Sequence, residues 1–234
     1  MASNTGPVLK PFDEDLDQLR ATIAEMGGLA EAAIAESMRA LVERDLEGAS
    51  RVVEDDKKLD LLEAEVEARA VQIIALRAPI ADDDLREVVA ALKIAGVVER
   101  MGDYAKNIAK RVRAIQRNAN LRPLSLLPEM ARMVAEMVHD TLDAFVARDA
   151  RKASLVCDRD RAVDDYYNSI FRVLMTFMME DPNNITAATH LLFIAKNLER
   201  IGDHSTNVAE MVYFAATGSR LRERERGIDS TASG

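Results

Sequence analysis

The chain has 234 residues, of which 48% are hydrophobic and 4% are aromatic, and it contains no Trp. Its 40 acidic side chains outnumber 31 basic ones and leave a formal net charge of −9, which excludes nucleic acid as a default partner because nucleic-acid affinity rests on basic patches. A single cysteine excludes an internal disulfide framework, and no apolar stretch is long enough to cross a bilayer. We therefore expect a cytoplasmic protein without direct membrane insertion.

The first half of the chain predicts three helices. Apolar side chains recur at three- and four-residue spacing over residues 12–44, which is typical of a helix with one buried face. Asp45 is expected to cap the start of a second helix, over residues 45–76, which stops ahead of a proline. Three consecutive aspartates favour the start of a third helix, over residues 82–118, because negative charge is stabilised at a helix N-terminus.

The second half predicts the same arrangement, with helices over residues 128–147, 150–180 and 184–217. Short connections force neighbouring helices to run antiparallel, and no strand pattern is present. The predicted fold is all-α, with two tandem antiparallel three-helix bundles over residues 12–119 and 126–217 and a disordered tail over residues 218–234.

An internal repeat supports this division into two halves. The sequence ERMGDYAKNIA begins at Glu99, and ERIGDHSTNVA begins at Glu199. A second match, offset by 104 residues, aligns the segment that starts at Arg44 with the segment that starts at Arg148. The period is too long for a solenoid of small repeats, so the pattern indicates a duplicated domain.

Each half carries two pairs of acidic side chains that are four residues apart. Residues at that spacing lie on one face of a helix, where like charges oppose helix formation. Any single pair is ordinarily a solvated face, but recurrence in register favours two pockets that hold cations. Carboxylate ligands suit Mg, Mn, Ca or Fe, and Zn is a further candidate. The predicted ligands are Asp56, Asp60, Glu99 and Asp103 in the first half and Asp160, Asp164, Glu199 and Asp203 in the second.

Glycines and arginines lie beside these carboxylates in both repeats. Gly102 and Gly202 interrupt helices at a cost of about 1 kcal/mol each relative to Ala, so they indicate a close approach of a ligand or of a neighbouring helix. Arg100 and Arg200 either orient neighbouring carboxylates, meet an anion, or form ordinary surface ion pairs.

Other reactive side chains give weaker signals. Glu136 and His139 have the Glu-x-x-His spacing of di-iron bundles, but this motif occurs once, so a ferroxidase is disfavoured. His190 and His204 are expected to make local contacts. Cys157 is expected in the core, and so are Met175, Met178 and Met179, for which an exposed docking surface is the alternative.

The chain resembles the PhoU family of bacterial phosphate signalling over about residues 12–217. The resemblance is carried by DLEGASRVVEDDKKLDLL, which begins at Asp45, and by the two repeated blocks. It implies a metal ion or small metal cluster in each half, held by a pair of Glu/Asp-x-x-x-Asp motifs that all eight carboxylates match. It also implies that Asn107 and Asn207 are additional or supporting ligands, and it leaves the identity of the metal open.

The resemblance further implies a regulator rather than an enzyme. Such a protein holds the phosphate-starvation response off when phosphate is abundant, by acting on the ATPase subunit of a phosphate ABC transporter and on a sensor histidine kinase. It also implies a homodimer that works at the inner face of the membrane through its partners. Two alternatives remain, a carboxylate-bridged metal-dependent hydrolase or oxidase and a metal-free helical scaffold.

Overall fold

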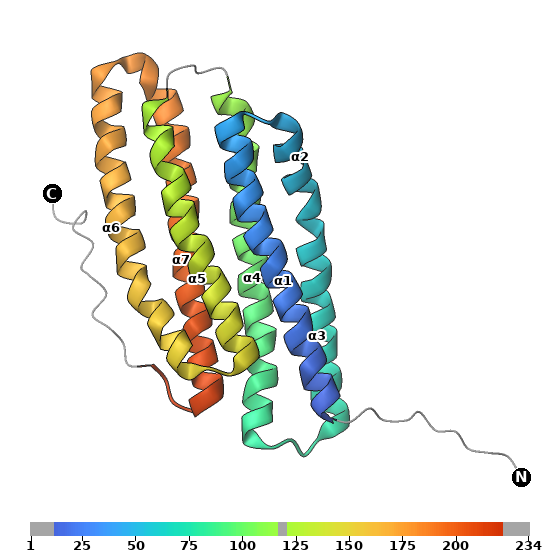
Figure 1. Ribbon diagram of the computed structural model, residues 1–234. Helices are drawn as coiled ribbons and strands as arrows, with labels where there is room; N and C mark the ends of the chain where they lie inside the picture. Colours follow the sequence, from blue (N-terminus) through green and yellow to red (C-terminus); the bar gives the residue numbers. More distant parts are fainter. Residues whose placement is uncertain (1–11, 117–120, 222–234) are drawn as a thin grey trace, which may run out of the picture.

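The structure, a computed structural model, describes residues 12–116 and 121–221, and all regular elements in these ranges are helical (Figure 1). The predicted all-α class is therefore confirmed. The first half contains α1 (Phe12–Glu43), α2 (Leu46–Asp55), α3 (Lys57–Arg77) and α4 (Asp82–Ile115). The second half contains the 3₁₀ turn η1 (Arg122–Leu126), α5 (Leu127–Ala147), α6 (Ala150–Glu180), the 3₁₀ turn η2 (Pro182–Asn184) and α7 (Ile185–Thr217).

The duplication is visible in how two of the helices begin. The Asp45 side chain accepts a hydrogen bond from the Gly48 N–H at 2.9 Å, and the Asp149 side chain accepts one from the Lys152 N–H at 2.9 Å. These side chains satisfy backbone donors that the first turn of a helix leaves unpaired. The same capped turn therefore joins α1 to α2 and α5 to α6, which confirms Asp45 as an N-cap.

The second predicted helix is divided at Asp56. Here the Leu59 N–H donates to the Asp56 carbonyl at 2.9 Å, which is the tighter i→i+3 pattern, and the backbone of Asp56 itself keeps helical angles. The corresponding helix of the second half, α6, is continuous. The expectation of one unbroken second helix was wrong at this residue, whose side chain is buried against α4.

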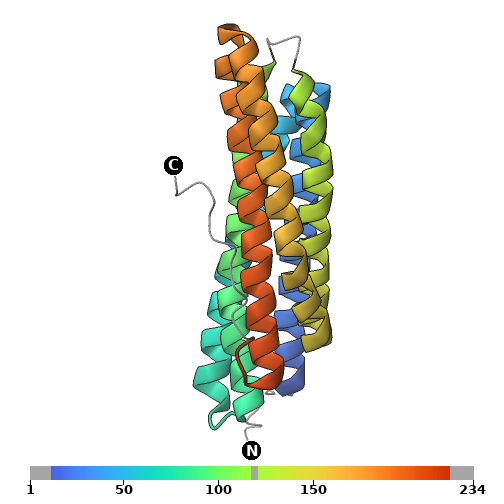
Figure 2. The ribbon, with the colours of Figure 1, turned by 90° about the vertical axis from the view of Figure 1, so that its left-hand side faces the viewer.

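The two bundles pack side by side and share one hydrophobic core. Helices α1 and α5 lie against each other across the boundary, as do α4 and α7, while α3 and α6 are outermost (Figures 1 and 2). Gly27 permits the contact between α1 and α5, because a Cβ there would lie 2.2 Å from Leu142 Cδ1. Buried side chains from both halves belong to one continuous cluster, so the duplicated halves form a single packed unit.

A buried ion-pair group crosses the same boundary. Glu87 on α4 has a side chain that is 4% exposed, and it lies 2.5 Å from Arg20 Nε on α1. Its other oxygen lies 3.0 Å from Arg148 Nη2, at the end of α5. Removal of a buried charge from such a group leaves its partners uncompensated, so Glu87 is a strong candidate for stabilising the junction.

Met175 and Met179 are 42% and 76% exposed, so the expectation that they lie in the core was wrong, whereas Cys157 is buried as expected. Most of the tail predicted over residues 218–234 lies outside the described residues. No helix in the described ranges is long and apolar enough to cross a membrane.

Candidate metal centres

The clearest carboxylate cluster lies between α6 and α7. Asp164 on α6 and Glu199 and Asp203 on α7 each offer an oxygen, and these oxygens all lie within 4.8 Å of one another. Glu199 Oε1 accepts a hydrogen bond from Lys196 Nζ at 2.6 Å. Its second oxygen, Oε2, is buried without a hydrogen-bond partner. An orphaned buried carboxylate oxygen beside two others fits a hard cation better than it fits a closed salt bridge.

The electrostatics of this cluster are unfavourable without a cation. The pKa of Asp164 is raised to about 6, first by burial and then by the charges of Asp160 and Glu199. The pKa of Asp203 is likewise raised to about 6, first by burial and then by the charges of Glu199, Asp160 and Asp164. We call these four residues the second-half centre. A bound cation would offset both the burial and the repulsion that raise the two pKa values.

The corresponding first-half centre, formed by Asp56, Asp60, Glu99 and Asp103, is arranged differently. Lys106 Nζ donates to Asp56 Oδ2 at 2.5 Å and to Asp103 Oδ1 at 2.9 Å. Across the described ranges, the only acidic side chains that approach one another as closely as metal ligands do are Asp164, Glu199 and Asp203. Asp160, the fourth predicted ligand of the second-half centre, is not part of this close group. The ammonium group of Lys106 therefore already supplies a positive charge to the first-half centre.

Glu63 adds a fifth carboxylate near the first-half centre, and the sequence analysis did not identify it. The pKa of Glu99 is raised to about 7 by burial and then by Asp103, Glu63, Asp60 and Asp56. Glu63 lies one turn beyond Asp60 on α3, a spacing that extends the acidic ladder. Its repeat counterpart, offset by 104 residues, is Tyr167, so a search for residues shared by both repeats passes over it.

The lysines of the two centres also occupy different repeat positions. Lys106 corresponds to Thr206 and Lys196 corresponds to Gly96 under the offset of 100. Lys196 Nζ lies 5.3 Å from the ring centroid of Tyr167, in addition to its bond with Glu199. Each centre therefore has one lysine. Lys106 bridges two predicted ligands, Asp56 and Asp103, whereas Lys196 contacts only one, Glu199.

The expected supporting residues make few contacts with the carboxylates. Asn107 is exposed and Asn207 is half-buried, and within the described ranges neither amide donates a hydrogen bond to a predicted ligand. Arg100 and Arg200 are both exposed. Neither lies within ion-pair distance of a carboxylate in the described ranges, although Arg100 lowers the pKa of Glu63 against the effect of burial. Their role as supporting residues remains a prediction.

The two glycines differ in what surrounds them. A Cβ at Gly102 would lie 2.2 Å from Leu59 Cδ1, in the buried contact between α3 and α4. A Cβ at Gly202 would meet Val163 Cγ1 at 3.4 Å, which is an ordinary contact. Close helix packing therefore explains Gly102, whereas nothing nearby requires glycine at position 202.

Substitution of each glycine by Ala separates these environments. Gly202→Ala is expected to raise the free energy of unfolding by about 0.5–1 kcal/mol because Ala favours a helix more strongly than Gly. Gly102→Ala is expected to lower it by about 1 kcal/mol, since Leu59 must be displaced from a packed site. Urea denaturation of both variants measures the difference, and equal effects would contradict the packing described here.

The pKa of Asp203 gives a prediction about pH. Its folded-state pKa of about 6 exceeds the unfolded value near 3.9, so its contribution to stability is most favourable below about pH 4 and is lost as pH rises through 6. In chelator-treated protein, Asp203→Asn is therefore expected to raise the free energy of unfolding by about 1 kcal/mol at pH 7.5, allowing for solvent exposure, and by much less at pH 4.

Urea denaturation across this pH range tests that prediction. The pKa values of His190 and His204 are lowered, chiefly by burial and then by nearby arginines. Comparison of the variant with the parent at each pH removes any contribution that does not depend on residue 203. Glu210→Gln, an exposed change on the same helix, is the control and should show no such pH dependence. A constant difference between parent and Asp203→Asn would contradict the raised pKa.

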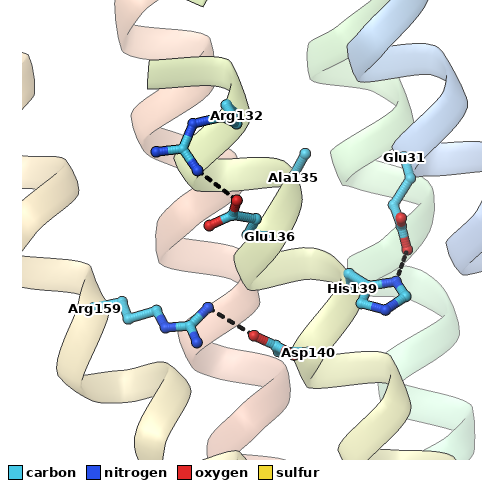
Figure 3. A pocket seen from close by; sticks show the side chains of 7 residues that line it. All are labelled: Glu31, Arg132, Ala135, Glu136, His139, Asp140 and Arg159. Atoms are coloured by element: carbon cyan, nitrogen blue, oxygen red, sulfur yellow. Dashed lines mark hydrogen bonds and ion pairs between the residues drawn. The ribbon is translucent and has the colours of Figure 1, made fainter. Parts of the chain in front are cut away.

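A separate surface cavity of about 410 Å³ lies among α1, α5 and α6 (Figure 3). Glu136 pairs with Arg132 at 2.5 Å, whereas His139 lies 3.3 Å from Glu31 on α1. The two residues of the Glu-x-x-His motif thus face different partners, as Figure 3 shows. Arg159 in the same cavity pairs with Asp140 at 2.6 Å.

Comparison with known proteins agrees with this architecture. The family model described as "PhoU domain" matches the chain twice, over residues 23–112 and 127–212. A PhoU homologue from Zymomonas mobilis, called a phosphate-specific transport system accessory protein, is 56% identical over 99% of this chain and 98% of its own length. A homologue of the same description from Rhizobium meliloti is 44% identical over 97% of this chain and 95% of its own.

Solved structures give the same result. The crystal structure of PhoU from Pseudomonas aeruginosa matches with a TM-score of 0.85 and 33% identity, covering 89% of this chain and all of that one. The phosphate transport system regulatory protein PhoU from Streptococcus pneumoniae matches with a TM-score of 0.84 and 27% identity, over 91% of this chain. With both halves matched and relatives aligned over nearly their whole length, the chain belongs to the PhoU family.

Proposed function

We propose that the chain is a negative regulator of the phosphate-starvation response and a modulator of phosphate uptake. The observation that carries this proposal is the match of both halves to the PhoU domain, together with close relatives that are named accessory proteins of phosphate-specific transport systems. At the coarser level, the chain has a role in regulating phosphate transport. The finer proposal is that it acts by contact with the ATPase subunit of a phosphate ABC transporter and with a sensor histidine kinase.

Metal binding is the second part of the proposal. The orphaned oxygen of Glu199 and the three converging carboxylates support a site at the second-half centre for Mg, Mn, Ca, Fe or Zn. A bound cation would supply positive charge that neutralises Asp164, Glu199 and Asp203. These side chains come from α6 and α7, so the residues that hold the ion would also hold the two helices together. This would fix one face of the bundle in a single conformation for docking.

Affinity capture tests the regulatory proposal. The tagged full chain, crosslinked in phosphate-replete cells, is expected to recover the ATPase subunit of a phosphate transporter and a sensor histidine kinase, and loss of the chain should switch on a phosphate-starvation reporter in phosphate-rich medium. An unchanged reporter together with recovery of neither partner would contradict the proposal. Light scattering of the purified chain tests the proposed homodimer separately.

A further inference from the structure

Helix α3 has apolar side chains on two opposite faces. One face is buried in the bundle through Leu59, Val66 and Ile73, which recur at seven-residue spacing. The opposite face consists of five exposed side chains, Leu61, Ala64, Ala68, Val71 and Ala75. Their alternating spacing of three and four residues is the a and d pattern of a coiled coil, so they form one stripe along the helix. We call these five residues the outer face of α3.

The outer face is more apolar than the exposed side of a bundle helix usually is. Leu61 is 72% exposed and Val71 is 64% exposed. Lys57 lies one turn before the stripe, and no polar side chain interrupts it from Leu61 to Ala75. A surface helix ordinarily carries polar residues on the side away from the core, whereas a helix that is apolar on both sides is covered on both. Within the described ranges α3 packs on α1, α2 and α4 at the edge of the bundle (Figure 1), and no other described element covers this face.

The fold itself does not require this stripe, because the other repeat lacks it. Helix α6 is the counterpart of α3 and is likewise outermost (Figures 1 and 2). Under the offset of 104 residues, the five positions of the outer face correspond to Asp165, Asn168, Arg172, Met175 and Met179. Polar side chains therefore break the stripe in α6. The unbroken stripe belongs to the first half alone and indicates an occupant rather than a need of the bundle.

Acidic side chains flank the outer face. Asp60 and Glu67 occupy coiled-coil g positions on one side, Glu65 occupies an e position on the other, and all three are exposed. Glu65 Oε1 lies 2.9 Å from Arg69 Nη2, but no basic side chain lies at ion-pair distance from Asp60 or Glu67 in the described ranges. A second copy of the chain would bring like charges together across the stripe, whereas a helix flanked by Lys or Arg pairs with them.

We propose that the outer face of α3 binds an amphipathic helix of a partner protein, whose apolar stripe is flanked by lysines or arginines. Burial of Leu61 and Val71 supplies most of the favourable free energy, as apolar burial does in most associations between proteins. The acidic flanks select against helices with acidic flanks of their own. The inference rests on the proposed regulatory function, which requires protein partners, and it adds the surface and the chemistry by which one of them is recognised.

Fluorescence anisotropy of the purified full chain with a synthetic peptide tests the proposal. The probe is a labelled helical peptide of three heptads with Leu at a and d and Lys at e and g, and its twin carries Glu at e and g. The parent is expected to bind the lysine peptide at least about tenfold more tightly than the glutamate twin. Leu61→Gln and Val71→Gln are each expected to weaken that binding about tenfold, because each removes apolar area from the contact. Glu67→Lys is expected to weaken it about threefold to tenfold.

Two variants elsewhere in the chain are the matched controls. Met175→Gln changes the repeat counterpart of Val71 on α6, and Glu210→Lys makes on α7 the same change in net charge as Glu67→Lys. Both should bind the lysine peptide like the parent, and circular dichroism should show all variants folded. Equal losses in these controls would mean that the peptide is attracted only to an acidic protein, and they would overturn the proposal. So would a parent chain that does not prefer the lysine peptide.

Other occupants of the outer face give different results. If a second copy covers it, Val71→Gln changes the oligomeric state measured by light scattering. If residues 1–11 cover it, their deletion tightens binding of the lysine peptide. Either result overturns the proposal. The experiment uses neither the starvation reporter nor captured partners, so its failure and that of the regulatory proposal are distinguishable.

Discussion

Glu87→Gln is expected to lower the free energy of unfolding by about 2–3 kcal/mol, because it leaves the guanidinium of Arg20 without its buried counter-ion. The substitution preserves the shape of the side chain, so the loss reports charge rather than a cavity. Arg20 and Arg148 have side chains that are 19% and 42% exposed, which keeps the expected effect at the lower end for buried pairs. For a chain of this length the melting temperature should fall by about 5–10 °C.

Two further variants make that measurement decisive. Glu136→Gln removes a carboxylate that also lies 2.5 Å from an arginine, but both side chains are more than half exposed, so the loss should be below about 1 kcal/mol. The double variant Arg20→Met with Glu87→Met should recover most of the stability, since apolar residues often replace a buried ion pair without loss. Equal destabilisation by Glu87→Gln and Glu136→Gln in urea denaturation would show that the buried group does not stabilise the junction.

The helices could be predicted from the sequence because local signals determine them. Apolar spacing, the capping aspartates Asp45 and Asp149, and the acidic first turn of α4 each act within a few residues of their own position. The contact between the halves could not be predicted in the same way. Gly27 against Leu142 and Glu87 against Arg148 join residues far apart in the chain, and Glu87 corresponds to Ala187 in the repeat.

The candidate centres were predictable to the extent that the two repeats agree. The shared carboxylates identified both centres, and the structure brings Asp164, Glu199 and Asp203 together. The repeats do not share Lys106, Lys196 or Glu63, so comparison of the two copies gave no signal for them. A lysine one turn beyond an acidic pair is also common on solvated helices, where it would have no special meaning. Only packing of α3 on α4 reveals that Lys106 bridges Asp56 and Asp103.

Manganese is expected to stabilise the chelator-treated chain through the second-half centre. A free concentration one hundred times the dissociation constant contributes about 2.7 kcal/mol, which corresponds to a rise of about 5–10 °C in melting temperature. Asp203→Asn should abolish most of this rise, whereas Asp103→Asn should leave it largely intact because Asp103 is already paired with Lys106. Glu210→Gln controls for the change in net charge on α7.

The most informative result of that experiment is the sign of the stability difference between Asp203→Asn and the parent. Without metal the variant should be more stable than the parent at pH 7.5, since it removes a carboxylate whose charged form is disfavoured by burial and by its acidic neighbours. With saturating manganese the order should reverse, because only the parent keeps the complete ligand set. A purely structural role for Asp203 predicts the same order of stability in both conditions, so failure to reverse would remove the case for a metal at this centre.

Lys106→Thr gives the first repeat the residue that the second repeat has at this position. Because Lys106 pairs with Asp56 and Asp103, its removal is expected to add a manganese-dependent rise in melting temperature. A further Asp103→Asn change in that variant should abolish this rise.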